Sequence, residues 1–227
     1  MDPSTNAADS SPTGLRWRLT ARLTARSRRR RFERFMAELR PGEDDDLLDV
    51  GVIDTSWRSS NFLEAWYPWP ARITAVGLEP MPDFERSFPA VTFVAADGRA
   101  LPFADDTFAI GFSNAVVEHV GSSDDQRRFV AELVRTCRRA FIATPNAGFP
   151  IDPHTLLPFV HWLPRRYRDP LLRRLGQGRW ASEAALHPLS ARELLGLFPV
   201  GTPVRLVRQR VAGLTTVLIA VTGAERD

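Results

Sequence analysis

The 227-residue chain is predicted to fold as a doubly wound α/β domain. Two apolar runs, at residues 91–97 and 107–114, flank a turn-rich link, and neither alternates as a half-exposed strand would. Such runs are typical of interior strands that are covered on both faces. Further strand-like runs alternate with helix-like segments along the chain, as in a parallel sheet. Polar residues Asp97 and Asn114 end the two runs, at the strand ends where such sheets bind ligands.

Five features follow one another in the stretch from residue 91 to residue 120. The first strand ends in Asp97, Leu101-Pro102-Phe103 follows, and the acidic pair Asp105–Asp106 forms a turn. The next strand begins with Phe108, and the stretch closes on Glu118-His119-Val120. In this order they resemble the class I methyltransferases that depend on S-adenosylmethionine (SAM), in particular the type 11 group.

The resemblance covers about residues 46–222 and carries expectations for fold and cofactor. It implies a Rossmann-like methyltransferase fold, a seven-stranded sheet of strand order 3-2-1-4-5-7-6. It implies SAM as the cofactor and a methyl group as what is transferred. No metal is expected, because the four histidines, His119, His154, His161 and His187, lie apart in the sequence and form no ligand-spacing motif.

Composition is that of a globular protein, with 44% hydrophobic and 25% charged residues. No apolar run reaches the length of a membrane span, and no signal peptide is recognisable, so a cytoplasmic location is expected. The single cysteine excludes an internal disulfide framework. All 30 basic residues are arginine and the net charge is only +3, so nothing clearly indicates nucleic acid as a partner.

Three segments are expected: a disordered stretch at 1–14, a basic helical extension at 15–40, and a methyltransferase domain at 41–227. In the extension, Phe32, Phe35, Met36 and Leu39 have helical spacing. We expect this stripe to pack on the domain. A basic arm for nucleic acid or anionic lipid is the alternative.

The first strand leads into the loop at which the family binds the methionine end of SAM. Asp49 and Gly51 match its Asp-x-Gly-x-Gly-x-Gly pattern, but Ile53 and Thr55 stand at the next two glycine positions. Glycine lets the backbone approach a ligand closely. Asp54 is expected either to contact the cofactor or to cap the next helix, and both interpretations stay open.

The second and third strands end in carboxylates. Residues 60–67 predict a short helix before the second strand, which ends at Glu79. In the family, an acid at this position accepts hydrogen bonds from the ribose hydroxyls, and an acid at the position of Asp97 accepts from the adenine amino group. The backbone of Gly98 is expected to help hold the ring.

The fourth strand ends at Asn114, a candidate cofactor-binding residue at the rim. Beyond it, His119 is a candidate catalytic residue that accepts a proton from the acceptor, oriented by Glu118. A structural role for His119 in the loop is equally open.

A helix from a capping box at 123–126 to Arg139 is expected, with Cys137 in its buried stripe. The fifth strand follows at 140–146. A second capping box at 190–193 opens a last helix through Leu197 or Phe198. Two closing strands are expected after it.

Residues 146–180 interrupt the alternation with proline, aromatic residues, histidine and arginine. The segment leaves the fifth strand on the cofactor rim, so we expect an acceptor-binding insertion or lid. His154 is its candidate catalytic residue, and the alternative is that it satisfies buried backbone groups. Peripheral membrane contact through 15–40 or 155–175 is an alternative use of the arginine-flanked apolar segments.

The predicted function is transfer of the SAM methyl group to an oxygen or nitrogen nucleophile of a small-molecule or glycan-type acceptor. One alternative is a catalytically silent SAM-fold module at a membrane surface or partner protein. A less favoured one is an NAD-dependent oxidoreductase, which also uses a glycine-rich first turn and an acid after the second strand.

Overall fold

The computed structural model describes residues 15–55, 60–152, 154–182 and 186–223, so the expectations for 1–14 lie outside the described residues. Within these ranges the strands are β1 (Leu47–Val50), β2 (Ile73–Gly77), β3 (Thr92–Ala95), β4 (Phe108–Asn114), β5 (Cys137–Pro145), β6 (Val204–Val211) and β7 (Leu214–Thr222). The α-helices are α1 (Leu15–Leu39), α2 (Phe62–Trp66), α3 (Pro82–Ser87), α4 (Ser123–Thr136), α5 (Arg165–Arg174) and α6 (Ala191–Leu195). The short 3₁₀ helices are η1 (Pro70–Arg72), η2 (Val117–His119), η3 (Val160–Trp162) and η4 (Gly178–Trp180).

All these strands form one sheet in the order β3-β2-β1-β4-β5-β7-β6, which confirms the predicted order. β1 pairs in parallel with β2 on one side and with β4 on the other. β7 runs antiparallel between β5 and β6. Because the direction of chain progression reverses between β1 and β4, a ligand site is expected beyond the carboxyl ends of these two strands.

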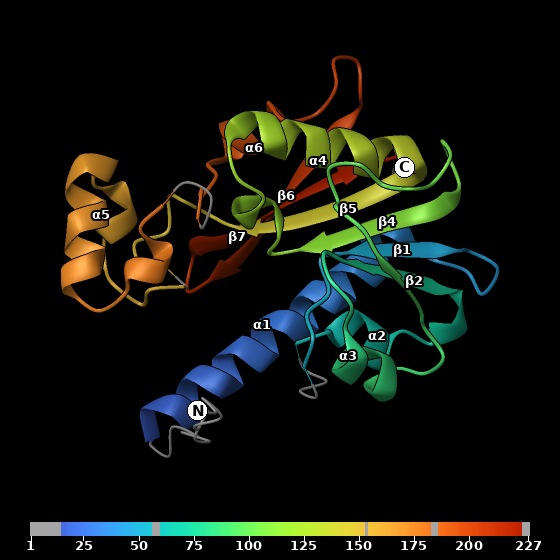
Figure 1. Ribbon diagram of the computed structural model, residues 1–227, viewed down its shortest axis with the longest axis horizontal. Helices are drawn as coiled ribbons and strands as arrows, with labels where there is room; N and C mark the ends of the chain where they lie inside the picture. The colour runs from blue at the N-terminus through green and yellow to red at the C-terminus, as the bar shows by residue number, and fades with distance from the viewer. Residues whose placement is uncertain (1–14, 56–59, 153, 183–185, 224–227) are drawn as a thin grey trace, which may run out of the picture.

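Helices cover both faces of the sheet, with α4 and α6 on one face and α1, α2 and α3 on the other (Figure 1). On the first face, the buried stripe of α4 contacts the sheet through Phe129, Val130 and Leu133. On the second face, α1 contributes Phe32 and Phe35 to a separate buried cluster. Because both faces of the central strands are buried, their sequences are continuous apolar runs without polar alternation.

Helix α1 packs on the sheet through the predicted stripe. The side chain of Phe35 is fully buried, and its ring meets Phe112 and Phe141 edge-on at centroid distances of 5.1 and 5.6 Å. Phe32 and Leu39 are also buried. The helix begins at Leu15, earlier than the stripe alone indicates. The extension is therefore held by core contacts as well as by charge.

The boundary between α4 and β5 differs from the prediction. The capping box uses Ser122 and Asp125 in place of residues 123–126, and the helix ends at Thr136 instead of Arg139. Cys137 belongs to β5, where it pairs with Phe108 of β4. The parallel ladder with β4 accounts for the early helix end, because its hydrogen bonds replace those of a further helical turn. Cys137 is buried as predicted, and burial raises the pKa of its thiol to about 12.

The strand β3 and the helix α6 are shorter than predicted, and β3 is also less buried than predicted. Residues 91–97 form a shorter strand at the sheet edge, and its residues are exposed or half-buried. The expectation of a fully buried interior strand is therefore wrong for β3, since it has a neighbouring strand on one side only. α6 has the predicted capping box, between Ser190 and Glu193, but ends at Leu195.

The insertion after β5 stands beyond the ends of β4 and β5, with α5 farthest from the sheet (Figure 1). It has a small apolar cluster of its own, formed by Val160, Leu172 and Ala181. A bridge between Asn146 and Leu189 closes its base. Among the described residues, none of the helices is both long enough and apolar enough to span a bilayer.

Candidate functional site

A cavity of about 690 Å³ opens at the carboxyl ends of β1, β2 and β4 and at the loop after β3. This volume lies within the range of about 300–1,000 Å³ that is usual for small-molecule sites. Four of the predicted site residues line it: Gly51, Asp97, Gly98 and His119. Much of the remaining wall is apolar, with Val50, Val52, Ile53, Val76, Leu78, Met81, Ala96, Ala115, Val116, Val120 and Phe129.

Gly51 occupies a position that no other residue could fill without rearrangement. Its φ of +105° is unfavourable for side chains, and a Cβ atom there would lie 2.2 Å from Cγ2 of Val116. Its N–H donates to the carbonyl of Val76 at 2.8 Å, which ties the loop to β2. A Cβ atom on Gly98 would likewise lie 2.7 Å from the Phe129 ring. At both positions the neighbouring side chains leave no room for a Cβ atom, so glycine allows the cavity wall to pack closely.

Asp97 lies on the cavity wall in an ion pair with Arg99, at 2.7 Å. Hydrogen bonds from Arg99 lower the pKa of the Asp97 carboxyl, which is therefore ionised at neutral pH. Arg99 also reaches Asp125 at 3.1 Å. Asp97 is thus an anionic hydrogen-bond acceptor with a defined orientation, as recognition of an amino group requires.

Two predicted residues flank the cavity without lining it. The Asp54 carboxylate accepts hydrogen bonds from the backbone N–H groups of Asp83 and Phe84, at 2.8 and 2.9 Å. It therefore holds the start of α3, and not that of the next helix along the chain, α2, as the capping alternative had it. Glu79 is exposed, two residues beyond the end of β2, and its neighbour Leu78 lines the cavity.

Asp49 and Asn114 point to buried polar partners beneath the rim. Burial, and then the charge of Glu64, raise the pKa of the Asp49 carboxyl well above its usual value. Burial also raises the pKa of Glu64. Because both acids are buried and close together, ionisation of one disfavours ionisation of the other. The side-chain oxygen of Asn114 accepts a hydrogen bond from Arg31 of α1, so the extension reaches the strand end.

The two candidate catalytic histidines lie side by side, although 35 positions separate them in the sequence. The Nε2 atoms of His119 and His154 are 3.0 Å apart. Oε1 of Glu118 is 4.0 Å from each of these nitrogens. Glu118, His119 and His154 together form the His–His–Glu cluster. The two histidines lie apart in the sequence, but the insertion folds back over η2 and brings them together.

Further polar side chains surround the cluster. Oε2 of Glu118 accepts a hydrogen bond from Thr144 of β5 at 2.9 Å. Oδ2 of Asp152 lies 3.7 Å from Nδ1 of His154. Burial raises the pKa of the Asp152 carboxyl, but the His154 ring and the N–H of Thr155 outweigh burial and lower it to about 2.

Trp180 of η4 closes the outer side of the cluster. Its ring centroid is 5.7 Å from that of His119 and 5.2 Å from that of His154. Of the three cluster residues, His119 lines the large cavity, whereas Glu118 and His154 line a small void of about 10 Å³ behind it. His119 is thus the link between the cavity and the insertion.

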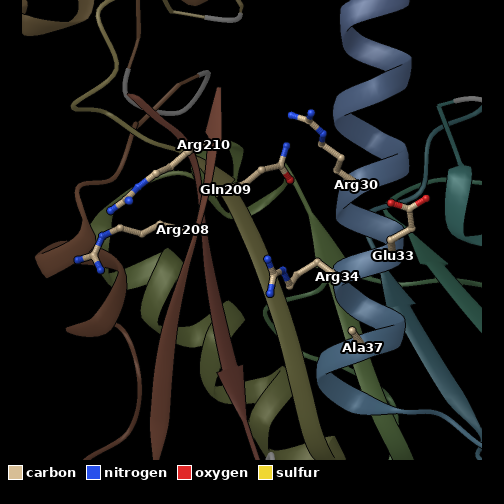
Figure 2. Close-up of a pocket in the computed structure, with 7 residues that line it drawn as sticks. All are labelled: Arg30, Glu33, Arg34, Ala37, Arg208, Gln209 and Arg210. Carbon is tan, nitrogen blue, oxygen red and sulfur yellow. The ribbon is translucent and has the colours of Figure 1, made fainter. Parts of the chain in front are cut away.

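A second cavity, of about 410 Å³, lies between α1 and the edge strand β6. Figure 2 shows Arg30 and Gln209 directed into the space between helix and strand, whereas Arg208 and Arg210 point away from α1. β5 and β7 separate β6 from the strands of the large cavity. None of the predicted site residues lines this groove, and its walls are long polar side chains.

Sequence reasoning missed Arg31, Arg99, Thr144, Asp152 and Trp180. Arg31 belongs to the basic helical extension, yet its side chain is buried. Its position directly before Phe32 of the apolar stripe is a signal that would have placed it near the core. Arg99 follows Asp97 by two positions, a short-range signal for an ion pair. Asp152 and Trp180 meet the site only through the path of the insertion, and Thr144 of β5 meets Glu118 because β4 and β5 are neighbouring strands.

Comparison with known proteins supports the same class. Residues 58–140 match the family model described as a methyltransferase domain. A search of curated proteins found no match. The matched region contains Glu79, Asp97 and His119, three of the residues predicted from the sequence. Over residues 58–140 the match confirms the predicted resemblance to the SAM-dependent methyltransferases, and it supports an enzyme that uses SAM as its cofactor.

Solved structures share the fold at low sequence identity. Geranyl diphosphate C-methyltransferase from Streptomyces coelicolor A3(2) matches with a TM-score of 0.55 and 15% identity, over 100% of this chain and 91% of that chain. The N-methyltransferase NodS from Bradyrhizobium japonicum WM9 matches with 0.54 and 14%, over 88% and 87%. A protein from Rhodobacter sphaeroides described as a putative zinc-dependent alcohol dehydrogenase matches with 0.60 and 11%, over 87% and 90%. At these identities the matches show a shared fold.

Proposed function

We propose that the chain transfers a methyl group from SAM to an oxygen or nitrogen nucleophile of a small-molecule or glycan-type acceptor. The observation that carries the proposal is the large cavity. Gly51 lines it directly after β1, Asp97 and Gly98 line it in the loop after β3, and His119 lines it on the side of the insertion. This arrangement joins a nucleotide-sized site to a polar cluster that can meet a second molecule.

The residues present fit the cofactor. Gly51 and Gly98 expose backbone at the cavity wall, and the largely apolar wall suits an adenine ring. Asp97 is ionised and accepts hydrogen bonds, and Glu79 stands on the rim where a ribose would lie. Asp49, Asp54 and Asn114 hold the surrounding loops and strand ends, so we assign them positioning roles. When bound, SAM supplies a methyl group on a positively charged sulfur.

His119 and His154 are proposed to contact the reacting group of the acceptor. Methyl transfer depends mainly on positioning, and a proton acceptor matters for nucleophiles that must lose a proton. His119 reaches the cavity, and His154 is held against it from the insertion. The insertion would therefore align the acceptor and exclude water from the reaction.

Titration calorimetry with SAM tests the binding half of the proposal, and transfer of labelled methyl groups to a small-molecule extract tests the acceptor. We expect one SAM site per chain. His154→Ala should lower methyl transfer at least tenfold, about 1.4 kcal/mol in the barrier, and leave SAM affinity unchanged. His161→Gln is the matched control, since His161 bonds the backbone of Ala147 outside the cluster. A wild-type chain that does not bind SAM refutes the proposal.

Membrane contact, if the acceptor is lipid-linked, is better supported for 155–175 than for 15–40. Phe159, Trp162 and Tyr167 of the insertion are each more than half exposed. Arginines of α5 flank them. In α1, by contrast, Phe32 and Phe35 are buried against the sheet. Sedimentation with anionic vesicles would test this, with binding expected to fall in a Phe159→Ser/Trp162→Ser variant.

A further inference from the structure

The His–His–Glu cluster presents three potential metal ligands that converge on one point. Its ligand atoms all lie within 4.8 Å of one another. The Nε2 atoms are separated by 3.0 Å, and each is 4.0 Å from Oε1 of Glu118. The point equidistant from the corners of this triangle is about 2.2 Å from each atom, near the zinc–nitrogen and zinc–oxygen distances of about 2.0–2.2 Å.

Oε1 of Glu118 provides an independent indication of a cation. The Glu118 side chain is only 1% exposed, and Oε1 makes no hydrogen bond among the described residues. A buried carboxylate oxygen without a partner is unfavourable, so such groups are normally paired or bound to metals. The oxygen faces both imidazole nitrogens, and a cation between the three atoms would neutralise it.

The surroundings of the cluster also suit a metal. The hydroxyl of Thr144 donates to Oε2 of Glu118 and thereby leaves Oε1 directed at the histidines. Asp152, behind His154, is fixed by the backbone N–H groups of His154 and Thr155 at 2.9 and 2.7 Å. Groups of this kind behind the ligands orient them in metal sites. The positive charge of Arg31 partly compensates the negative charge of Glu118. Two carboxylates, those of Glu118 and Asp152, lie beside His154, so one guanidinium leaves negative charge for a metal ion to neutralise.

From this geometry we infer that Glu118, His119 and His154 bind a divalent transition metal ion of the zinc type. Two imidazole nitrogens and one carboxylate suit zinc and its neighbours, whereas magnesium prefers oxygen ligands alone. Three protein ligands leave a fourth position open, as in catalytic zinc sites. The spacing of these residues in the sequence does not predict a metal site, because His154 reaches Glu118 and His119 only through the fold of the insertion.

The role of the metal rests on the proposed function and defines its acceptor further. Because His119 lines the large cavity, a ligand there can reach the open position. A hydroxyl oxygen of the acceptor would bind at that position, and a dication lowers the pKa of an oxygen that it binds. With their Nε2 atoms on the metal, His119 and His154 act as ligands and not as proton acceptors, and the hydroxyl proton leaves to solvent when the acceptor binds the metal, before methyl transfer. The inferred acceptor is therefore a compound with a hydroxyl group that can ligate a metal, such as a phenol or a sugar hydroxyl.

Metal binding is tested on the full chain after treatment with a chelator. Zn²⁺ is titrated in a calorimeter, and Co²⁺ is followed by its visible absorption, which reports coordination by imidazole and carboxylate. We expect one equivalent of each ion to bind and Mg²⁺ not to compete. His119→Gln and His154→Gln should each weaken Co²⁺ binding at least tenfold and alter the spectrum. His161→Gln should bind like the wild type.

Melting curves establish that each variant is folded, and the two single His→Gln variants keep the test valid if Glu118→Gln does not fold. Absence of saturable Zn²⁺ binding to the wild type overturns the inference and leaves a plain hydrogen bond between the imidazoles. Unchanged Co²⁺ binding in both His→Gln variants also overturns it, because the ion then binds elsewhere.

The outcome is distinguishable from failure of the proposed function. SAM binding without Zn²⁺ binding rejects the metal site and retains the methyltransferase. Zn²⁺ binding at the cluster without SAM binding retains the metal site and rejects the proposed methyl transfer.

Discussion

Arg31 brings a positive charge from α1 into the interior, at the carboxyl end of β4. Burial lowers the pKa of its guanidinium to about 10, the charge of Glu118 raises it, and the group stays protonated at neutral pH. It donates to the side chain of Asn114. The candidate site therefore includes a fixed cation beneath its rim, and a residue of the N-terminal helix shapes the electrostatics around Glu118.

Asp97 permits a prediction about cofactor affinity. Asp97→Ala should weaken SAM binding by about 1 kcal/mol, the low end of the range of about 1–3 kcal/mol for an unpaired polar partner. The low end applies because the Asp97 side chain is 37% exposed and water can replace part of the contact. Calorimetry on the variant measures the effect. Asp124→Ala, on the exposed first turn of α4, is the control, and equal affinities for all three proteins would contradict the assignment.

The buried acids Asp49 and Glu64 predict a pH dependence of stability. Both carboxyls have raised pKa values in the folded chain, first because of burial. Above the unfolded value of about 4 the folded chain therefore holds more protons than the unfolded chain, so stability falls as pH rises through the folded pKa values. Glu64→Gln removes one acid and with it part of this loss.

We expect Glu64→Gln to gain at least about 1 kcal/mol relative to wild type between pH 5 and pH 8, or roughly 2–4 °C in melting temperature. Calorimetric melting curves at the two pH values measure the difference. Glu85→Gln, on the exposed side of α3, should show no such change. A constant difference between Glu64→Gln and wild type at both pH values would show that the two acids are not coupled.

Among the elements, α1 and the insertion do most to adapt the common sheet to this protein. α1 covers one face of the sheet with aromatic side chains and sends Arg31 to the rim. The insertion stands on its own apolar cluster and carries His154, Asp152 and Trp180 to η2. One element therefore contributes mainly to the core, and the other brings polar and aromatic side chains to η2 beside the large cavity.

Removing the Phe35 ring measures how much α1 contributes to stability. Phe35→Ala should destabilise the chain by about 3–5 kcal/mol, because the ring is fully buried between two aromatic partners. Urea unfolding followed by circular dichroism gives the value. Arg34→Ala, one position away on the exposed side, should stay within about 0.5 kcal/mol of wild type. A loss below 1 kcal/mol for Phe35→Ala would mean that α1 detaches easily in solution.

At the scale of the whole molecule, cofactor binding should couple to folding, because the cavity is formed by several strand ends and loops together. SAM at about 100 times its Kd should stabilise the chain by about 2.7 kcal/mol, which for a domain of this size is roughly 5–10 °C in Tm. Thermal unfolding with and without SAM measures the shift. NAD at the same concentration should produce none, and a larger shift with NAD would favour an oxidoreductase.

The sequence alone determined the sheet order, through the resemblance carried by residues 97–120, and it determined Gly51, Asp97 and Gly98 as cavity residues. These features are local: a strand end and the turn that follows it occupy adjacent positions in the chain. For the same reason, the capping box at Ser190 was readable from four consecutive residues.

Only the tertiary structure decided what distant segments do together. The His–His–Glu cluster, the burial of Arg31 and the pair of Asp49 with Glu64 each join residues from separate elements. The edge position of β3 and the helix end at Thr136 likewise depend on which strands are neighbours. The physical reason is that burial and mutual distance set the charge state and partners of a polar side chain, and both arise only when the chain has packed.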